Sequence, residues 1–166
     1  MTGPRLVLVG PMGAGKTTVA TLLGERWGVE IRDTDADVEA TVGKSVQEIF
    51  VDDGEAAFRE LERAAVAAAL KTHDGVLSLG GGAVLDSDTQ VLLKEHPVVF
   101  LRVGLADAVK RVGLGTGRPL LLGNVRARVK QLLDERTPVY ESVATLTVDT
   151  DGLTPTEVAD RIEEQL

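Results

Sequence analysis

Short apolar runs alternate with longer segments whose apolar residues recur at helical spacing along this chain of 166 residues. The short runs are β-branched and mostly apolar on both faces, which is typical of buried parallel strands, and they predict strands at 5–9, about 30–33, 76–79, 98–103 and 144–148. The longer segments predict helices at 16–28, 35–41, 45–50, 54–71, 87–95, 104–112, 124–141 and 154–166. This alternation favours an α/β fold in which helices cover both faces of a parallel sheet.

Local signals at the ends of these segments predict where helices begin and end. We expect Gly28 to be the C-cap of the first helix and Thr34 or Asp35 to be the N-cap of the second. Ser45 and Glu48 have the spacing of a capping box, which predicts a helix start. No repeat or linker divides the chain, so we expect one domain over 1–166, with inserts at about 34–63 and 113–124. The second insert is rich in glycine and favours a mobile lid, with an ordinary surface loop as the alternative.

Composition narrows the function classes. The net charge of −8 argues against nucleic-acid binding, and an anionic substrate would need a local cluster of arginines. The chain has no cysteine, which excludes disulfides and thiolate chemistry, and we expect both histidines, His73 and His96, to be solvated. We find no apolar stretch of membrane-spanning length and no room for a signal peptide before the first strand. We therefore expect a cytoplasmic protein without membrane partners. We also expect a monomer.

The segment Gly10-Pro-Met-Gly-Ala-Gly-Lys-Thr17 matches the pattern G-x-x-x-x-G-K-[ST] between a predicted strand and a predicted helix. Backbone N–H groups of such a loop surround phosphate oxygens, and the helix N-terminus adds positive potential. Lys16 is suited to the β- and γ-phosphates and the Thr17 hydroxyl to Mg²⁺. The alternative is a chance glycine-rich turn, which the order of strand, loop and helix disfavours. The segment predicts a nucleoside triphosphate site.

A pair of carboxylates, Asp33 and Asp35, follows the second predicted strand. One is suited to the Mg²⁺ shell and the other to a hydroxyl of a phosphoryl acceptor, because phosphoryl transfer needs mainly positioning and electrostatic stabilisation. The alternative is a pair that only caps a helix. The third predicted strand does not end in aspartate, so Asp33 is the candidate for the metal carboxylate.

Other residues point to the binding of a small anion. Gly80-Gly81-Gly82 follows the third strand and suggests close approach of a ligand to the backbone, with a flexible turn as the alternative. Arg59 and Glu62 are helix neighbours, and the alternative there is a surface ion pair. Two further arginines are candidates to bind phosphate or carboxylate groups. Arg118 lies in the glycine-rich segment, and Arg136 lies in the long predicted helix that follows it.

Taken together, these motifs resemble the shikimate kinase family over nearly the whole chain. The resemblance rests on the phosphate-binding loop, Asp33-Thr34-Asp35, Ile49-Phe50 with Gly54-Glu55 and Phe58-Arg59 with Glu62, Gly80-Gly81-Gly82, Arg118-Pro119-Leu120, and Arg136 before Pro138. It implies a P-loop fold whose five parallel strands have the order 2-3-1-4-5. It also implies transfer of the γ-phosphoryl group of ATP to the 3-hydroxyl of shikimate, with Mg²⁺, on the route to chorismate and aromatic amino acids.

The resemblance also implies a role for each site residue. Lys16, Asp35 and Arg118 would be catalytic, and Thr17 and Asp33 would serve the metal. ATP contacts would come from Gly13, Ala14, Gly15, Lys16, Thr17, Thr18, Arg111, Arg118 and Pro155. Shikimate contacts would come from Asp35, Phe50, Phe58, Arg59, Glu62, Gly80, Gly81, Gly82, Pro119 and Arg136.

Three other interpretations are weaker. Another small-molecule kinase, such as a gluconate kinase or a nucleoside monophosphate kinase, would differ only in its acceptor. A GTPase switch is disfavoured because the chain lacks the Asn-Lys-x-Asp motif that recognises guanine. A catalytically inert nucleotide-binding relative would not need the intact set of lysine, aspartates and arginines.

Overall fold

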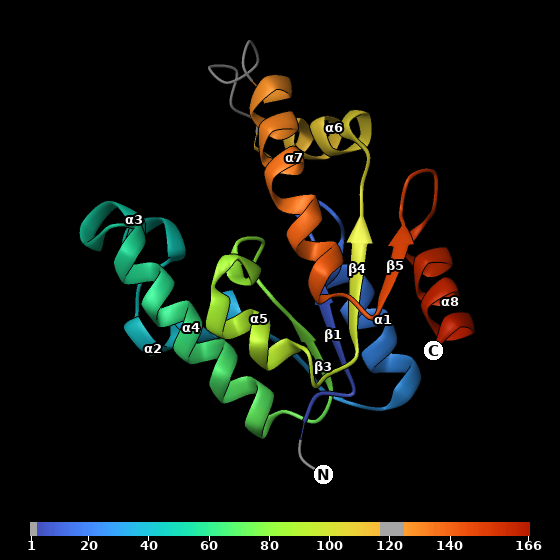
Figure 1. Cartoon of the computed structure of the whole chain (residues 1–166), viewed down its shortest axis with the longest axis horizontal. Coiled ribbons are helices and arrows are strands. Elements are labelled where there is room, and N and C mark those ends of the chain that lie inside the picture. Colours follow the sequence, from blue (N-terminus) through green and yellow to red (C-terminus); the bar gives the residue numbers. More distant parts are fainter. Residues whose placement is uncertain (1–2, 117–124) are drawn as a thin grey trace.

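The computed structural model describes residues 3–116 and 125–166 (Figure 1). Arg118, Pro119 and most of the glycine-rich segment expected at 113–124 lie outside this part of the chain. The described part contains a five-stranded parallel sheet with the order β2-β3-β1-β4-β5, which confirms the predicted fold. The strands are β1 (Leu6–Val9), β2 (Ile31–Asp33), β3 (Val76–Ser78), β4 (Val98–Arg102) and β5 (Leu146–Asp149).

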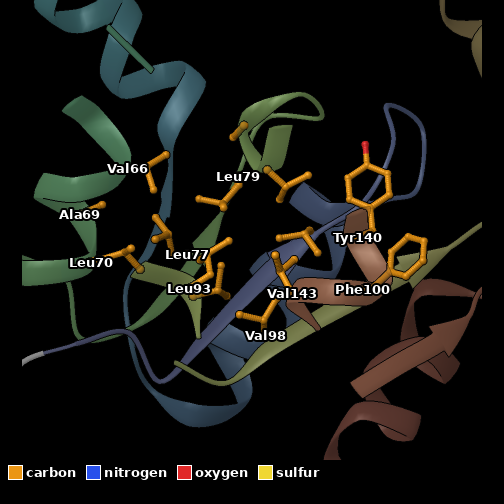
Figure 2. Packing of buried hydrophobic residues seen from close by; sticks show 14 residues of the cluster. Val66, Ala69, Leu70, Leu77, Leu79, Leu93, Val98, Phe100, Tyr140 and Val143 are labelled. Atoms are coloured by element: carbon orange, nitrogen blue, oxygen red, sulfur yellow. The ribbon is translucent and has the colours of Figure 1, made fainter. Parts of the chain in front are cut away.

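Helices cover both faces of the sheet because alternate strand residues point to opposite sides. Val7 and Val9 of β1 pack with α4 (Glu55–Thr72), α5 (Ser87–Leu93) and α7 (Val125–Val143), and this cluster fills Figure 2. Leu6 and Leu8 pack on the other face with α1 (Lys16–Trp27) and α8 (Pro155–Gln165). The central strand β1 is therefore buried on both sides, and its backbone cannot shift without disturbing two cores.

Two smaller clusters lie beyond the sheet. Val38, Ile49 and Phe58 pack α2 (Thr34–Val42) and α3 (Val46–Asp53) against the start of α4. Val103, Ala108 and Val129 join α6 (Leu105–Thr116) to α7 near the end of β4. These clusters hold helices beside the carboxyl ends of the strands, where ligands bind in open parallel sheets.

The observed helix boundaries agree with the predicted ones in some places and differ from them in others. Gly28 is the αL C-cap of α1, with φ of 65°, and Ser45 forms the predicted capping box with Glu48. The N-cap of α2 is Asp33, not Thr34 or Asp35, because the Asp33 side chain accepts a hydrogen bond from the Asp35 N–H. Helix α6 continues to Thr116 and so includes the first residues of the segment that we expected to be a loop. A short 3₁₀ helix, η1 (Ala83–Leu85), was not predicted.

His73 is a second correction, since it is buried rather than solvated. The chain turns there from α4 into β3, and the ring Nε2 lies 3.1 Å from the Val76 carbonyl oxygen. The turn passes close to the neighbouring strand segment at Gly75. A Cβ there would lie only 1.9 Å from the Glu30 carbonyl oxygen, so the position requires glycine. His96 is half-buried. Within the described ranges, no helix has the length and apolar character needed to span a membrane.

Candidate active site

A cleft of about 930 Å³ opens at the carboxyl ends of β1, β2 and β3. Its walls come from the P-loop (residues 10–17), from α3 and α4, from the glycine loop after β3 (residues 80–82), and from α7. Parallel strands bring their carboxyl ends to one edge, so residues far apart in sequence meet there. Predicted site residues that line this cleft are Gly13, Gly15, Lys16, Thr17, Thr18, Asp33, Asp35, Phe50, Phe58, Arg59, Glu62, Gly80, Gly81, Gly82 and Arg136.

The P-loop is shaped by glycines with positive φ and by its lysine. Gly13 and Gly15 have φ of 84° and 90°, a backbone conformation that residues other than glycine rarely adopt. Lys16 Nζ donates to the carbonyl oxygens of Gly10 at 2.7 Å and Pro11 at 3.0 Å. Burial lowers the pKa of Lys16 to about 8, although Asp33 and Asp35 oppose this shift. A triphosphate would therefore meet a positively charged amine already directed along the loop.

The segment from Asp33 to Asp35 connects the end of β2 to the glycine loop. Thr34 is fully buried, and its hydroxyl oxygen accepts a hydrogen bond of 3.3 Å from the Gly80 N–H. Asp35 Oδ1 is buried and has no hydrogen-bond partner among the described residues. Burial, and then the charge of Asp33, raise the pKa of Asp35. A buried carboxylate oxygen without a donor favours a ligand that supplies an O–H group.

The residues Thr17 and Asp33 fit a magnesium site of the kind that nucleotides complete. Both line the cleft beside Lys16, and the N-cap bond to Asp35 occupies only Oδ1 of Asp33. Mg²⁺ in such sites takes one or two protein oxygens together with phosphates and water. No group of three or more acidic or histidine ligands occurs in the described part of the chain.

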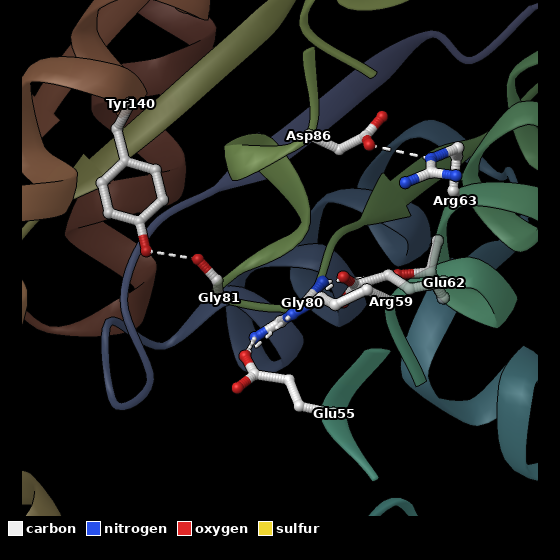
Figure 3. A network of polar contacts seen from close by, with 9 residues as sticks. Glu55, Arg59, Glu62, Arg63, Gly80, Gly81, Asp86 and Tyr140 are labelled. Atoms are coloured by element: carbon white, nitrogen blue, oxygen red, sulfur yellow. Dashed lines mark hydrogen bonds and ion pairs between the residues drawn. The ribbon is translucent and has the colours of Figure 1, made fainter. Parts of the chain in front are cut away.

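Arg59 and Glu62 form a partly buried ion pair rather than the surface pair considered from the sequence. Arg59 Nη1 lies 2.8 Å from Glu62 Oε1, and the Glu62 side chain is only 4% exposed (Figure 3). Glu55 holds the outer side of the same guanidinium at 3.3 Å. Burial raises the pKa of Glu62, against the hydrogen bond from Arg59. The pair fixes one orientation of the guanidinium at the rim of the cleft.

The three consecutive glycines lie where side chains would collide with functional groups. A Cβ at Gly80 would lie 2.6 Å from Asp35 Oδ1, and a Cβ at Gly82 would lie 2.6 Å from Arg59 Nη1. A Cβ at Gly81 would meet Arg136 Nη1 at 3.7 Å, which is ordinary contact. The loop therefore has Asp35, Arg59 and Arg136 as close neighbours. This arrangement supports close approach of a ligand rather than a merely flexible turn.

Apolar groups and one unexpected hydroxyl complete the site. The rings of Phe50 and Phe58 lie 5.0 Å apart and form an apolar wall. Tyr140 follows Arg136 by one turn of α7, and its hydroxyl donates a 2.5 Å hydrogen bond to the Gly81 carbonyl oxygen (Figure 3). Sequence analysis missed both Tyr140 and Thr34. The available signals were the helical spacing of Tyr140 from Arg136 and the place of Thr34 between two aspartates.

The structure does not bring every predicted residue into the cleft. Ala14 is buried in the core beneath the P-loop, and Pro155 is exposed at the start of α8. Arg111 does not line the cleft, and it donates a 2.9 Å hydrogen bond to the Gly13 carbonyl oxygen of the P-loop. The predicted contacts of Arg118 and Pro119 concern residues outside the described ranges.

Comparison with known proteins agrees with this geometry. The family model described as "Shikimate kinase" matches residues 12–166. A shikimate kinase of Thermobifida fusca is 58% identical over 98% of this chain and 95% of its own, and one of Salinispora arenicola is 62% identical over 94% of this chain and 93% of its own. The structure of a shikimate kinase from Acinetobacter baumannii in complex with shikimate has a TM-score of 0.90 and 33% identity, covering 99% of this chain and 93% of that chain.

A gluconokinase from Sinorhizobium meliloti has a TM-score of 0.58 at 19% identity, which shows a shared fold alone. The alternative of a gluconate kinase is therefore less supported than the interpretation that the motifs favoured. The family match spans residues 12–166, a range that contains the P-loop lysine, both aspartates and the glycine loop, and the relatives also match almost the whole chain. The chain belongs to the shikimate kinase family, whose members are ATP-dependent kinases that act on an alcohol.

Proposed function

We propose that the cleft holds ATP at the P-loop and shikimate between α4, the glycine loop and α7. The reaction is that of the family: the γ-phosphoryl group of ATP moves to the 3-hydroxyl of shikimate, giving shikimate 3-phosphate and ADP. One observation carries the assignment of the acid site. Arg59 and Arg136 come from different helices and both lie against the glycine loop, in the same cleft as Lys16 and Asp35.

The two arginines suit the carboxylate of the acceptor. Guanidinium groups bind carboxylates through paired N–H donors, and Glu62 already fixes the orientation of Arg59. The net charge of −8 makes the overall field of the protein unfavourable for two anionic substrates, so local cations have to provide the attraction. Phe50 and Phe58 supply an apolar wall for the carbon ring.

Asp35 would receive the reacting hydroxyl. Its buried Oδ1 has no donor in the described structure, so an incoming O–H satisfies it. Phosphoryl transfer proceeds through a loose transition state, in which orienting the attacking oxygen and stabilising charge matter most. Lys16 would bind the β- and γ-phosphate oxygens in place of its present backbone acceptors.

Thr17 and Asp33 would hold Mg²⁺, directly through the Thr17 hydroxyl and through water at the carboxylate of Asp33. The ion would supply positive charge beside the phosphates, which would balance their negative charge. Arg118 and Pro119 lie outside the described residues. We propose for them the roles that the family resemblance implies, with Arg118 on the phosphates and Pro119 on the shikimate ring.

The test is ADP release from Mg-ATP with shikimate, gluconate or a nucleoside monophosphate as acceptor. Rapid release with shikimate alone is the expected outcome, and release with gluconate alone would contradict the proposal. Arg136→Ala should raise KM for shikimate by about 10²-fold and leave KM for ATP within about twofold, because it removes a charged hydrogen-bond partner of the acid. A rise in KM for ATP instead would place Arg136 at the nucleotide. Arg126→Ala, an exposed change on the same helix, is the matched control.

A further inference from the structure

The hydroxyl of Tyr140 reaches the glycine loop from the hydrophobic core. Tyr140 is completely buried in the core cluster on the α7 face of the sheet, where its ring lies 4.9 Å from that of Phe100 (Figure 2). From this position the hydroxyl donates to the Gly81 carbonyl oxygen at 2.5 Å (Figure 3). Packing against Phe100 accounts for the ring but not for the hydroxyl, since a phenylalanine would fill the same space.

The hydrogen bond sets the orientation of one peptide unit. In a trans peptide the C=O and the following N–H point in opposite directions. Because Tyr140 binds the Gly81 carbonyl on the core side, the Gly82 N–H points away from the core. In the described part of the chain this N–H has no hydrogen-bond acceptor. Gly82 lines the cleft beside the Arg59 guanidinium. On that side the Gly81–Gly82 peptide therefore offers its N–H donor and not its carbonyl oxygen.

This orientation needs an anchor because the peptide lies between two glycines. Glycine reaches more of backbone space than any other residue, so rotation of a Gly-Gly peptide meets little steric resistance. The reversed peptide would present a carbonyl oxygen to an incoming carboxylate, which would repel it. The Thr34 hydroxyl holds the Gly80 N–H, but nothing besides Tyr140 holds the Gly81 carbonyl in the described structure.

We propose that Tyr140 is a positioning residue for the acceptor: its hydroxyl fixes the Gly81–Gly82 peptide so that the Gly82 N–H, with Arg59 and Arg136, faces the carboxylate of the acid. Tyr140 touches no reacting atom and acts through this peptide, and its hydroxyl also lies close to the Arg136 guanidinium. Burial raises the pKa of the Tyr140 hydroxyl against the opposing effect of Arg136, so the group stays a protonated donor at neutral pH. The inference rests on the proposed acid site, which Arg136→Ala tests separately.

The first experiment compares Tyr140→Phe with Val143→Ala. Tyr140→Phe keeps the ring and removes only the donor, and we expect KM for shikimate to rise about threefold to tenfold, the effect of one lost hydrogen bond. KM for ATP and kcat should change less than about twofold. Val143→Ala removes buried methyl groups from the same cluster and helix without touching the loop. It should lower thermal stability and leave both KM values unchanged.

Unchanged KM for shikimate in Tyr140→Phe would overturn the proposal. An equal rise in Val143→Ala would also overturn it, because general destabilisation would then explain the effect. If Arg136→Ala leaves KM for shikimate unaltered, the acid site itself is misplaced. A rise with Arg136→Ala but not with Tyr140→Phe rejects the role of Tyr140 alone.

A second measurement needs no substitution, because Tyr140 is the one tyrosine of the chain. Labelling with 3-fluorotyrosine gives a single ¹⁹F NMR signal from this ring. Shikimate should shift the signal, since a carboxylate bound at the Gly82 N–H polarises the peptide that accepts the Tyr140 hydrogen bond. ADP alone should leave it nearly in place. A signal that does not respond to saturating shikimate would contradict the proposal even if the variant failed to fold.

Discussion

Gly80 leaves just enough space for the buried oxygen of Asp35: a Cβ at position 80 would lie 2.6 Å from Asp35 Oδ1 and 3.0 Å from Glu62 Oε2. We expect Gly80→Ala to displace the Asp35 carboxylate and to lower kcat by about 10²-fold, as a shift of about 1 Å in a reacting group does. Steady-state kinetics with saturating shikimate and ATP would measure this loss.

Gly82→Ala provides the matched comparison. A Cβ there meets the end of the flexible Arg59 side chain at 2.6 Å, so the guanidinium has to move while Asp35 stays in place. The expected change is a higher KM for shikimate with kcat less affected than in Gly80→Ala. Equal effects of the two substitutions on kcat would show that the loop acts as a single unit and would reject the separate roles.

Asp35→Asn separates the role of the carboxylate in catalysis from its effect on folding. We expect kcat to fall by about 10²- to 10⁴-fold, because the amide cannot accept the proton of the attacking hydroxyl. The folded state raises the pKa of Asp35, mainly by burial, so ionisation of this group destabilises the fold as pH rises above the ordinary carboxyl range. At pH 7 the variant should therefore unfold at a temperature no lower than the wild type. Near-normal kcat would remove Asp35 from the reaction.

The lowered pKa of Lys16 predicts that nucleotide binding depends on pH. Its pKa of about 8 means that ATP affinity, measured by equilibrium titration, should be constant below that pH and fall as the ammonium loses its proton above it. Loss of the proton does not unfold the protein, because a lowered lysine pKa makes the folded state more stable as pH rises from about 8 towards the ordinary value.

The same titration in Asp35→Asn is an internal check. The charge of Asp35 raises the pKa of Lys16 against the effect of burial, so its removal should move the fall in ATP affinity to lower pH. An affinity that stays flat to pH 9.5 in the wild type would show that Lys16 does not carry the titrating charge.

Arg111 connects α6 to the P-loop through its bond to the Gly13 carbonyl oxygen. Arg111→Ala should raise KM for ATP about threefold to tenfold, because one hydrogen bond that supports the loop is lost. KM for shikimate should stay within about twofold. Lys110→Ala, an exposed change beside it on the same helix, should alter neither value. A rise in KM for shikimate with Arg111→Ala would assign Arg111 to the acid side of the cleft.

Much of the nucleotide site could be read from local sequence. Lys16 and Thr17 belong to one continuous motif whose geometry is set by nearby glycines and a helix start, so chain order alone places them. The alternation of strands and helices likewise predicted a parallel sheet covered on both faces, because apolar residues on both faces require a buried parallel strand. The order of the strands came from the resemblance to the shikimate kinase family. Here short-range backbone geometry and hydrophobic patterning determine the result.

The proposed acid site depends on tertiary structure. Arg59, Gly82 and Arg136 are distant in sequence, and only the packing of α4 and α7 on the same face of the sheet brings them together. From the sequence alone, Arg59 and Glu62 fit a surface ion pair as well as a binding site. Their burial in the folded protein shows that they are not a surface pair. The solvated reading of His73 failed for the same reason, since a polar turn in the sequence does not reveal which strand will cover it.

Tyr140 marks the limit of sequence reasoning for this chain. Its ring follows the apolar spacing of α7, which the sequence predicts, but its hydroxyl gains a partner only when α7 packs beside the loop after β3. Hydrogen bonds between distant segments depend on the register and crossing of whole elements, which no local pattern encodes. The sequence by itself therefore determined the fold and the phosphate loop, and tertiary packing decided how the groups of the proposed acid site face one another.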